Sequence, residues 1–316
     1  MTRILILLAC LVVSSSAWGQ APRTFREAKI IAKQQVYHDA NRHGDLYCGC
    51  SWTWVGESGG RMDLAGCGYQ VRARQERAER MEWEHVMPAS WFGRQRQCWQ
   101  SGGRENCQKD PVFSAMEADL HNLYPSVGEV NGDRSDYTLS VLPAATPFSY
   151  GQCRTRVDFS TRTADPRPEA RGLVARIHFY MADRYGVRLS EQQQRVLMAW
   201  DRHYPPSAWE LERDRRIARI TGVSNPFVTR VKVWGQPSIP APAVSPPASP
   251  QARPQVDLPA ITTQADSPVL GNRSSGIYHV RGICPGYDKI GTSNRVAFSS
   301  EGQAQASGFR RAKNCQ

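Results

Sequence analysis

The chain has 316 residues, nine cysteines and a formal net charge of +11. Its one long apolar run, Ile4 to Val13, holds ten residues, and a transmembrane helix needs about 20, which excludes a membrane anchor of that kind. A basic balance of this size indicates attraction to a polyanion, either nucleic acid or an anionic cell envelope. Charge alone does not choose between these two partners.

The first 19 residues have the organisation of a secretory signal peptide. Arg3 precedes the apolar run, and small and polar residues follow it up to Ala17-Trp18-Gly19. We therefore expect cleavage before Gln20 and a periplasmic or secreted mature protein. A lipoprotein signal at Leu7-Leu8-Ala9-Cys10 is the weaker alternative, because little apolar sequence precedes the cysteine and much follows it.

The elements that follow are mostly helical. Apolar residues at helical spacing, such as Leu173, Ile177 and Met181 with Gly186 as a stop, predict helices. The expected helices span residues 24–38, 112–122, 168–185, 190–203 and 207–220. Short aromatic or β-branched pieces between glycines predict strands at 51–55 and 69–71. The fold class is therefore α+β, mostly helical, with a small irregular sheet.

A spacer is expected at residues 236–268, which are rich in proline, alanine and serine. Such a composition cannot bury a core and is typical of an extended linker. It divides the mature chain into a large unit, 20–235, and a small unit, 269–316. The small unit is too short for a stable core without a cross-link, and it carries seven lysines and arginines against two acids.

Eight cysteines follow the signal peptide, an even number. They are Cys48, Cys50, Cys67, Cys98, Cys107, Cys153, Cys284 and Cys315. Among them the repeated C-x-x-C spacing of a zinc site does not occur. In an exported protein, disulfides are therefore the preferred interpretation, and the spacing leaves their pairing open.

Residues 81–89 and 119–134 carry a possible hydrolytic site. His85 is a potential general base, and the carboxylate of Glu84 and the amide oxygen of Asn131 suit a hard divalent cation such as Mg²⁺. Adjacent residues on a regular strand point to opposite faces, so Glu84 and His85 reach one site only if the strand bends or ends there. Pro88, just downstream, favours such an end.

These motifs carry a family resemblance over residues 20–235. The matching segments are Tyr47-Cys48-Gly49-Cys50, Cys67-Gly68-Tyr69-Gln70-Val71-Arg72, Glu82-Trp83-Glu84-His85-Val86, Gln97-Cys98-Trp99-Gln100, Gly103-Arg104-Glu105-Asn106-Cys107, Met116-Glu117-Ala118-Asp119-Leu120-His121-Asn122-Leu123 and Val127-Gly128-Glu129-Val130-Asn131-Gly132-Asp133-Arg134. This ordered pattern resembles the endonuclease I family of bacterial periplasmic or secreted nucleases.

The resemblance implies a ββα-metal site that cuts DNA, and often RNA, with little sequence preference. We expect double- and single-stranded DNA, and RNA, as partners. The products should carry 5′-phosphates if one ion binds the phosphate and leaving oxygens while a base deprotonates the attacking water. The resemblance also implies His85 as general base, Glu84 and Asn131 as ligands of one Mg²⁺ (or Mn²⁺ or Ca²⁺), and Arg104 as the cation on the scissile phosphate. Glu117 is expected to support the site. We further expect a monomer. The competing class of function is a noncatalytic protein that binds nucleic acid or an envelope polyanion.

Several neighbouring residues leave two interpretations open. His121 and Asn122 belong either to a hydrogen-bonded scaffold or to the site. Arg72 and Arg134 are either phosphate contacts or solvated surface arginines. The tryptophans either stack on bases or, as the default, pack in the core. They are Trp52, Trp54, Trp83, Trp91 and Trp99.

The small unit resembles a second family, the Ada-type metal-binding domain. The resemblance rests on segments such as Cys284-Pro285-Gly286-Tyr287-Asp288 and Ala312-Lys313-Asn314-Cys315. The zinc form uses four thiolates, and only Cys284 and Cys315 are present here, so zinc is not expected and a disulfide between them is. His279 is expected to be structural. The basic charge suggests an accessory contact with nucleic acid or an envelope polyanion.

Overall fold

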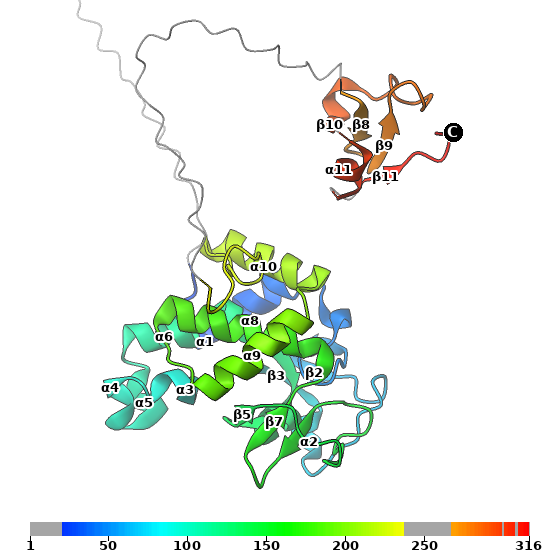
Figure 1. Ribbon diagram of the computed structural model, residues 1–316. Helices are drawn as coiled ribbons and strands as arrows, with labels where there is room; N and C mark the ends of the chain where they lie inside the picture. Colours follow the sequence, from blue (N-terminus) through cyan, green and yellow to red (C-terminus); the bar gives the residue numbers. More distant parts are fainter. Residues whose placement is uncertain (1–20, 237–266, 299, 307–308, 316) are drawn as a thin grey trace, which may run out of the picture. The chain divides into compact units, whose positions relative to one another are not determined.

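The structure is a computed structural model with two compact units, each considered by itself (Figure 1). It describes residues 21–236, 267–298, 300–306 and 309–315. The expected signal peptide and most of the expected spacer lie outside these ranges. Among the described residues, no helix is both long enough and apolar enough to cross a membrane.

The first unit contains a four-stranded antiparallel sheet in which strand order follows chain order. Its strands are β1 (Trp52–Val55), β2 (Gly59–Met62), β3 (Arg80–His85) and β4 (Leu123–Val127). Pairing of β3 with β4 runs from Met81 opposite Val127 to His85 opposite Leu123. All of β4 is buried, as are the last three residues of β3, so the end of β3 is held inside the unit.

Three long helices pack together in this unit (Figure 1). They are α8 (Pro168–Tyr185), α9 (Glu191–His203) and α10 (Ala208–Thr221). The side chains of Ser190 and Ser207 cap α9 and α10, and left-handed Gly186 and Gly222 follow α8 and α10. These bounds confirm the expected helices to within one residue, because both the apolar period and the end signals are present in the sequence.

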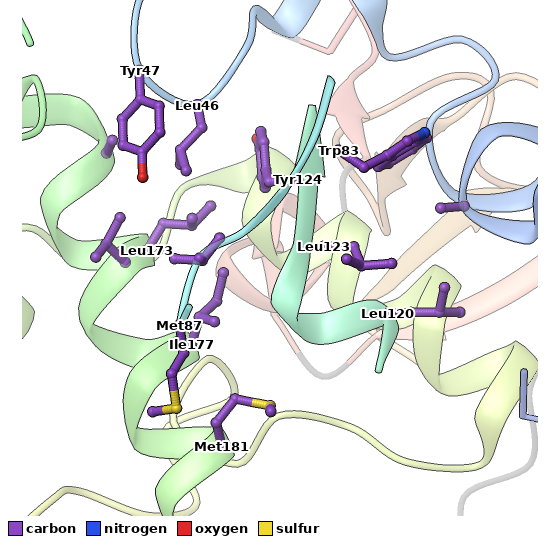
Figure 2. Close-up of a cluster of buried hydrophobic side chains, with 14 of the residues drawn as sticks. Leu46, Tyr47, Trp83, Met87, Leu120, Leu123, Tyr124, Leu173, Ile177 and Met181 are labelled. Atoms are coloured by element: carbon purple, nitrogen blue, oxygen red, sulfur yellow. The ribbon is translucent and has the colours of Figure 1, made fainter. Parts of the chain in front are cut away.

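The core joins these helices to the sheet. Figure 2 shows Leu173, Ile177 and Met181 on one side of α8, facing the region of Met87 and β4. Leu123 and Ile177 are almost fully buried in this cluster. Truncating such a side chain to alanine typically costs about 2–5 kcal/mol, so the cluster holds the end of β3 firmly against α8.

Three expected elements differ from the structure. The helix expected at 24–38 is α1 (Phe25–Ile31) followed by a π-helical turn (Ala32–Val36). The helix expected at 112–122 is α6 (Pro111–Glu117) and a separate 3₁₀ turn, because the Asp119 side chain accepts from the backbone N–H of His121 and starts a new turn. The strand expected at 69–71 is wrong: Tyr69 makes only an isolated bridge with Gly151.

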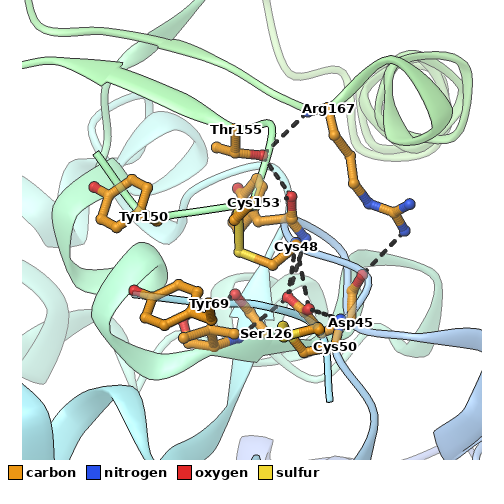
Figure 3. The surroundings of a disulfide bond; sticks show 12 residues. Asp45, Cys48, Cys50, Tyr69, Ser126, Tyr150, Cys153, Thr155 and Arg167 are labelled. Carbon is orange, nitrogen blue, oxygen red and sulfur yellow. Dashed lines mark hydrogen bonds between the residues drawn. A yellow bond between two sulfur atoms is a disulfide. The ribbon is translucent and has the colours of Figure 1, made fainter. Parts of the chain in front are cut away.

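Short elements and three disulfides complete the first unit. The elements are α2 (Gln75–Ala78), α3 (Ala89–Gly93), α4 (Gln97–Gln100), α5 (Gly103–Cys107), α7 (Gly128–Arg134), β5 (Thr138–Leu139), β6 (Arg156–Asp158) and β7 (Thr163–Asp165). The disulfides are Cys48–Cys153, Cys50–Cys67 and Cys98–Cys107. Figure 3 shows the first of them beside buried Asp45, whose carboxylate accepts from the backbone N–H groups of Tyr47, Cys48 and Cys50.

The second unit is a small mixed sheet with one helix. Its strands, in the order β10-β8-β9-β11, are β8 (Val269–Asn272), β9 (Ile277–Val280), β10 (Arg295–Phe298) and β11 (Arg310–Arg311), and its helix is α11 (Glu301–Ala306). The small hydrophobic core of this unit includes Val269, Tyr278 and Phe298. A disulfide joins Cys284 to Cys315, as expected from the sequence.

Candidate active site

A pocket of about 450 Å³ opens beside the end of β3. It is lined by Phe25, Arg77, Glu82, Trp83, Glu84, His85, Pro88, Ala89, Ser90, Trp99, Arg104, Asn131, Arg134, Ser135 and Asp136. Four of the five expected site residues are therefore brought together at one cavity. The fifth, Glu117, is buried beside it and contacts two of them, as described below.

Neighbouring Glu84 and His85 both line this pocket, at the end of β3. His85 is the last residue of β3. Two residues further on, the Met87 backbone N–H donates to Asn122 Oδ1 (2.8 Å), and Asn122 Nδ2 donates to the Met87 carbonyl (3.0 Å). This side chain holds the chain that follows His85, while Glu84 and His85 themselves stay paired with β4, opposite Tyr124 and Leu123.

His85 is held as a neutral imidazole with one nitrogen fixed. Its Nε2 lies 2.8 Å from the Glu117 carbonyl oxygen, and because a carbonyl only accepts, Nε2 carries the proton. The lone pair is then on Nδ1. The ring is 8% exposed and its centroid lies 4.6 Å from that of Phe25. Burial lowers the pKa of His85 to about 4; the Glu117 carbonyl opposes this shift, and the charges of Arg104 and Lys29 add to it.

Glu84 is a buried carboxylate with one oxygen already engaged. Its Oε1 accepts from the Tyr47 hydroxyl (2.6 Å) and from Arg134 Nη1 (3.0 Å). Burial raises the pKa of Glu84, and the charge of Arg134 and the Tyr47 hydrogen bond oppose that shift. Both hydrogen bonds to this carboxylate from described residues use Oε1, so Oε2 remains as a ligand atom for a cation.

Arg134 is a buried side chain whose guanidinium supports the pocket from inside the protein. Its side chain is 1% exposed. Besides Glu84, its guanidinium donates to the carbonyl of Val86 (2.8 Å) and more distantly to that of His85 (3.4 Å). Arg72 is likewise engaged, in a two-pronged pair with Asp133 (2.9 and 3.0 Å). Both guanidiniums are therefore held by protein groups.

Asn131 lies on α7 and is oriented by an acidic neighbour. Its Nδ2 donates to Glu82 Oε2 (3.2 Å), which leaves Oδ1 for another partner. Glu82 is itself fixed by Arg77, at 2.9 and 2.8 Å. The residues expected at the site did not include Glu82, Arg77 or Tyr47. Glu82 had a signal, because it is two residues from Glu84 and so lies on the same strand face.

Arg104 projects toward the pocket from α5. Its side chain is 46% exposed, and its Nε donates to Glu117 Oε1 at 2.6 Å. That contact uses Nε, so the two Nη groups can face an anion. Glu117 therefore serves two neighbours at once: its carboxylate orients Arg104 and its backbone carbonyl orients His85.

His121 and Asn122, whose role the sequence left open, make hydrogen bonds of the scaffold. Asn122 holds Met87, and the buried His121 places its Nε2 3.0 Å from the carbonyl of Val223. Trp52 is buried in the core, which agrees with packing as its role, whereas Trp83 and Trp99 also line the pocket.

The pocket offers a set of oxygen donors suited to a hard divalent cation. Glu84 supplies a carboxylate and Asn131 an amide, and neither a thiol nor a second imidazole lines the cavity. Carboxylate and carbonyl oxygens are the ligands that Mg²⁺, Mn²⁺ and Ca²⁺ prefer. The residues present therefore fit such an ion.

The chain resembles known proteins over most of its first unit. The profile of the family described as Endonuclease I matches residues 24–232. A periplasmic deoxyribonuclease of Aeromonas hydrophila is 44% identical over 231 residues, which cover 72% of this chain and 94% of that protein. An extracellular deoxyribonuclease of the same species is 46% identical over 209 residues, covering 66% and 90%. Endonuclease-1 of Buchnera aphidicola (subspecies Baizongia pistaciae) is 40% identical over 226 residues, covering 71% and 91%. The chain belongs to the endonuclease I family.

Proposed function

We propose that this protein is an exported, metal-dependent endonuclease that hydrolyses phosphodiester bonds of DNA with little sequence preference. Relatives across nearly their whole length are named periplasmic or extracellular deoxyribonucleases. The observation that carries the proposal is the pairing, at one pocket, of a neutral buried imidazole with a carboxylate that has a free oxygen. That pairing provides a base and a cation ligand side by side.

The proposed metal site uses the strand pair β3 and β4 with α7 as a ββα-metal motif. Glu84 Oε2 and Asn131 Oδ1 would hold one ion, Mg²⁺ in the first instance, with Mn²⁺ or Ca²⁺ as alternatives. When bound, such an ion supplies positive charge for the phosphate and the leaving oxygen. Arg77 and Glu82 keep the Asn131 amide oriented, and Tyr47 and Arg134 do the same for Glu84.

The protein groups then divide the reaction between them. His85 takes a proton from water at Nδ1 while Nε2–H stays bonded to the Glu117 carbonyl. The water oxygen attacks phosphorus and the bond to the 3′ oxygen breaks, so the products carry a 5′-phosphate and a 3′-hydroxyl. The Arg104 Nη groups neutralise charge on the phosphate oxygens. Glu117 holds Arg104 in place for this role.

The same site accepts several polymers in this proposal. Recognition through phosphate carries no base information, so we propose that double-stranded DNA, single-stranded DNA and RNA are all cleaved. We also propose that the protein acts as a monomer.

A plasmid assay separates this proposal from a noncatalytic binding protein. Purified protein is incubated with supercoiled plasmid in Mg²⁺ and, separately, in EDTA. We expect nicking and linearisation with Mg²⁺ and none with EDTA. Gel retardation without nicking under Mg²⁺, Mn²⁺ and Ca²⁺ would instead identify a protein that binds polyanions without cutting them.

A further inference from the structure

The second unit carries a groove of about 600 Å³ along β9 and β11. It is lined by Ser275, Ile277, His279, Arg310, Arg311, Ala312, Lys313 and Asn314. Three of these side chains are cationic and none is a carboxylate. Because β11 is the last strand in the order of this sheet, the cations lie at its edge, where a partner has access.

Two of these cations have no counter-charge in the described part of the unit. Arg310 and Lys313 are exposed, and among residues 267–298, 300–306 and 309–315 no ion pair or side-chain hydrogen bond engages either. Arg311 is also exposed and pairs with Glu301 at 3.3 Å. Glu301 is one of only two acidic residues in the sequence from 269 to 316, against seven lysines and arginines. The groove therefore holds three of the seven cations of this unit, two of them without a counter-charge among the described residues, and this favours an anionic ligand.

The rest of the lining is partly apolar and offers little surface on which bases could stack. Ile277 and Ala312 give the groove apolar wall, and His279 Nδ1 is buried without a hydrogen-bond partner. No aromatic side chain other than this imidazole lines it. Contacts with a nucleic acid would thus be made mainly to phosphate and sugar, which is recognition without sequence preference.

The cationic segment is held in one place. The Arg310 backbone N–H donates to the Gly276 carbonyl (2.9 Å), and that of Ala312 donates to the Tyr278 carbonyl (3.0 Å). Two residues after Lys313, Cys315 is bonded to Cys284. The positive charges are therefore presented on an ordered segment, which lowers the entropy lost when a ligand binds.

We propose that this groove is a second nucleic-acid-binding site, which grips the phosphodiester backbone of the DNA that the first unit cleaves. The proposal rests on the proposed function for its choice of polyanion. Residues 237–266 join the two units, so a strand bound at the groove raises the concentration of DNA that the pocket meets. The groove adds affinity for long DNA and takes no part in the chemistry.

The test compares two full-length variants with equal loss of charge. Arg310→Gln/Lys313→Gln removes the unpaired cations of the groove. Arg273→Gln/Lys289→Gln removes two exposed cations of the same unit that do not line it. Binding to a fluorescein-labelled duplex long enough to reach both units is followed by anisotropy, in EDTA and over a range of salt. We expect the groove variant to raise Kd at least about fivefold at low salt and to reduce the salt slope by about 1.8, or about 0.9 for each phosphate lost.

Controls keep the result interpretable. The control variant should retain the wild-type Kd and slope, both variants should keep the Cys284–Cys315 disulfide, and both should cleave a duplex of about ten base pairs at the wild-type rate. Equal Kd values for the groove variant and the wild type overturn the proposal, and so does an equal loss in both variants. If the groove variant still binds DNA but no longer binds phosphatidylglycerol vesicles, the groove is a site for the cell envelope instead. The wild type could also bind DNA in this way and yet fail to nick it with any divalent ion. That result would refute the proposed function, while the groove would still stand as a nucleic-acid-binding site.

Discussion

At the scale of single residues, the pocket depends on side chains that hold other side chains. Tyr47 and Arg134 fix Glu84, Glu82 fixes Asn131, and Glu117 fixes His85 and Arg104. Partners of this kind commonly change metal affinity by about 10–100-fold when they are removed. The supporting residues are therefore as testable as the expected ligands.

Tyr47→Phe and Glu82→Gln test this support. Each variant keeps the shape of the side chain but weakens the contact to a proposed ligand, so we expect the concentration of Mg²⁺ needed for half-maximal cleavage to rise about tenfold. The maximal rate at saturating Mg²⁺ should change much less. Glu76→Gln is a suitable control, because Glu76 is acidic and exposed but does not line the pocket. An unchanged Mg²⁺ requirement in both test variants would contradict the proposed support.

The pKa of His85 gives a pH prediction with a definite sign. Burial lowers it to about 4 in the folded protein, from about 6.5 in an unfolded chain. Between these two values the unfolded state binds more protons, so stability falls as pH falls through this window, by up to about 3 kcal/mol for this group. His178, buried with its pKa lowered to about 3, acts in the same direction.

Denaturant unfolding at pH 7 and at pH 4.5 measures this effect. We expect His85→Gln to lose less stability than the wild type on acidification, because glutamine does not titrate. Equal losses in the two proteins would show that His85 is not kept neutral by burial.

At the scale of elements, the disulfides lie next to the proposed site. Tyr47, which holds Glu84, directly precedes Cys48 in a segment closed by Cys48–Cys153 and Cys50–Cys67 (Figure 3). The Tyr47 carbonyl also accepts from the Thr155 hydroxyl at 2.6 Å. A disulfide typically contributes about 2–4 kcal/mol to stability. Loosening this segment therefore acts on both stability and the position of Glu84.

Reduction should consequently inactivate the enzyme. Cleavage of plasmid is measured before and after treatment with a dithiol, with free thiols counted by mass spectrometry. We expect activity to fall as Cys48–Cys153 and Cys50–Cys67 open. Full activity in protein shown to be completely reduced would be incompatible with this role of the two disulfides.

The same scale shows what the sequence could predict. The long helices α8, α9 and α10 were predictable because the apolar period agrees with end signals: serine caps begin α9 and α10, and glycines end α8 and α10. The strand expected at Tyr69 failed because that residue is held by tertiary contacts, including a hydrogen bond from its hydroxyl to Glu129, and not by a ladder. Tyr47 lies 37 residues before Glu84, and the two could not be joined without the disulfide pairing, which the cysteine spacing leaves open.

At the scale of the whole molecule, the proposed chemistry resides in the first unit. Each residue that lines the pocket lies between Phe25 and Asp136. The end of this unit is anchored by Trp234, whose ring stacks on Phe179 at 4.9 Å and whose Nε1 donates to Gln194. A chain that stops just after Trp234 therefore keeps its core contacts.

A shortened chain ending at Gly235 should retain turnover on a short oligonucleotide. Its affinity for long DNA should drop at low salt, and the difference from the full chain should shrink as salt rises, because phosphate contacts release counterions. A folded shortened chain without activity on the oligonucleotide would mean that the second unit contributes to catalysis.

Single-turnover cleavage by His85→Ala, Glu84→Gln and Asn131→Ala, titrated with Mg²⁺ beside the wild type, tests the proposed site most directly. His85→Ala should lower the rate at saturating Mg²⁺ by at least about 10²-fold with DNA affinity unchanged, because a general base acts only in the transition state. The other two variants should need more Mg²⁺. Near-wild-type cleavage by His85→Ala, or an unchanged Mg²⁺ requirement in both ligand variants, would contradict the assignment of base and ligands to this pocket.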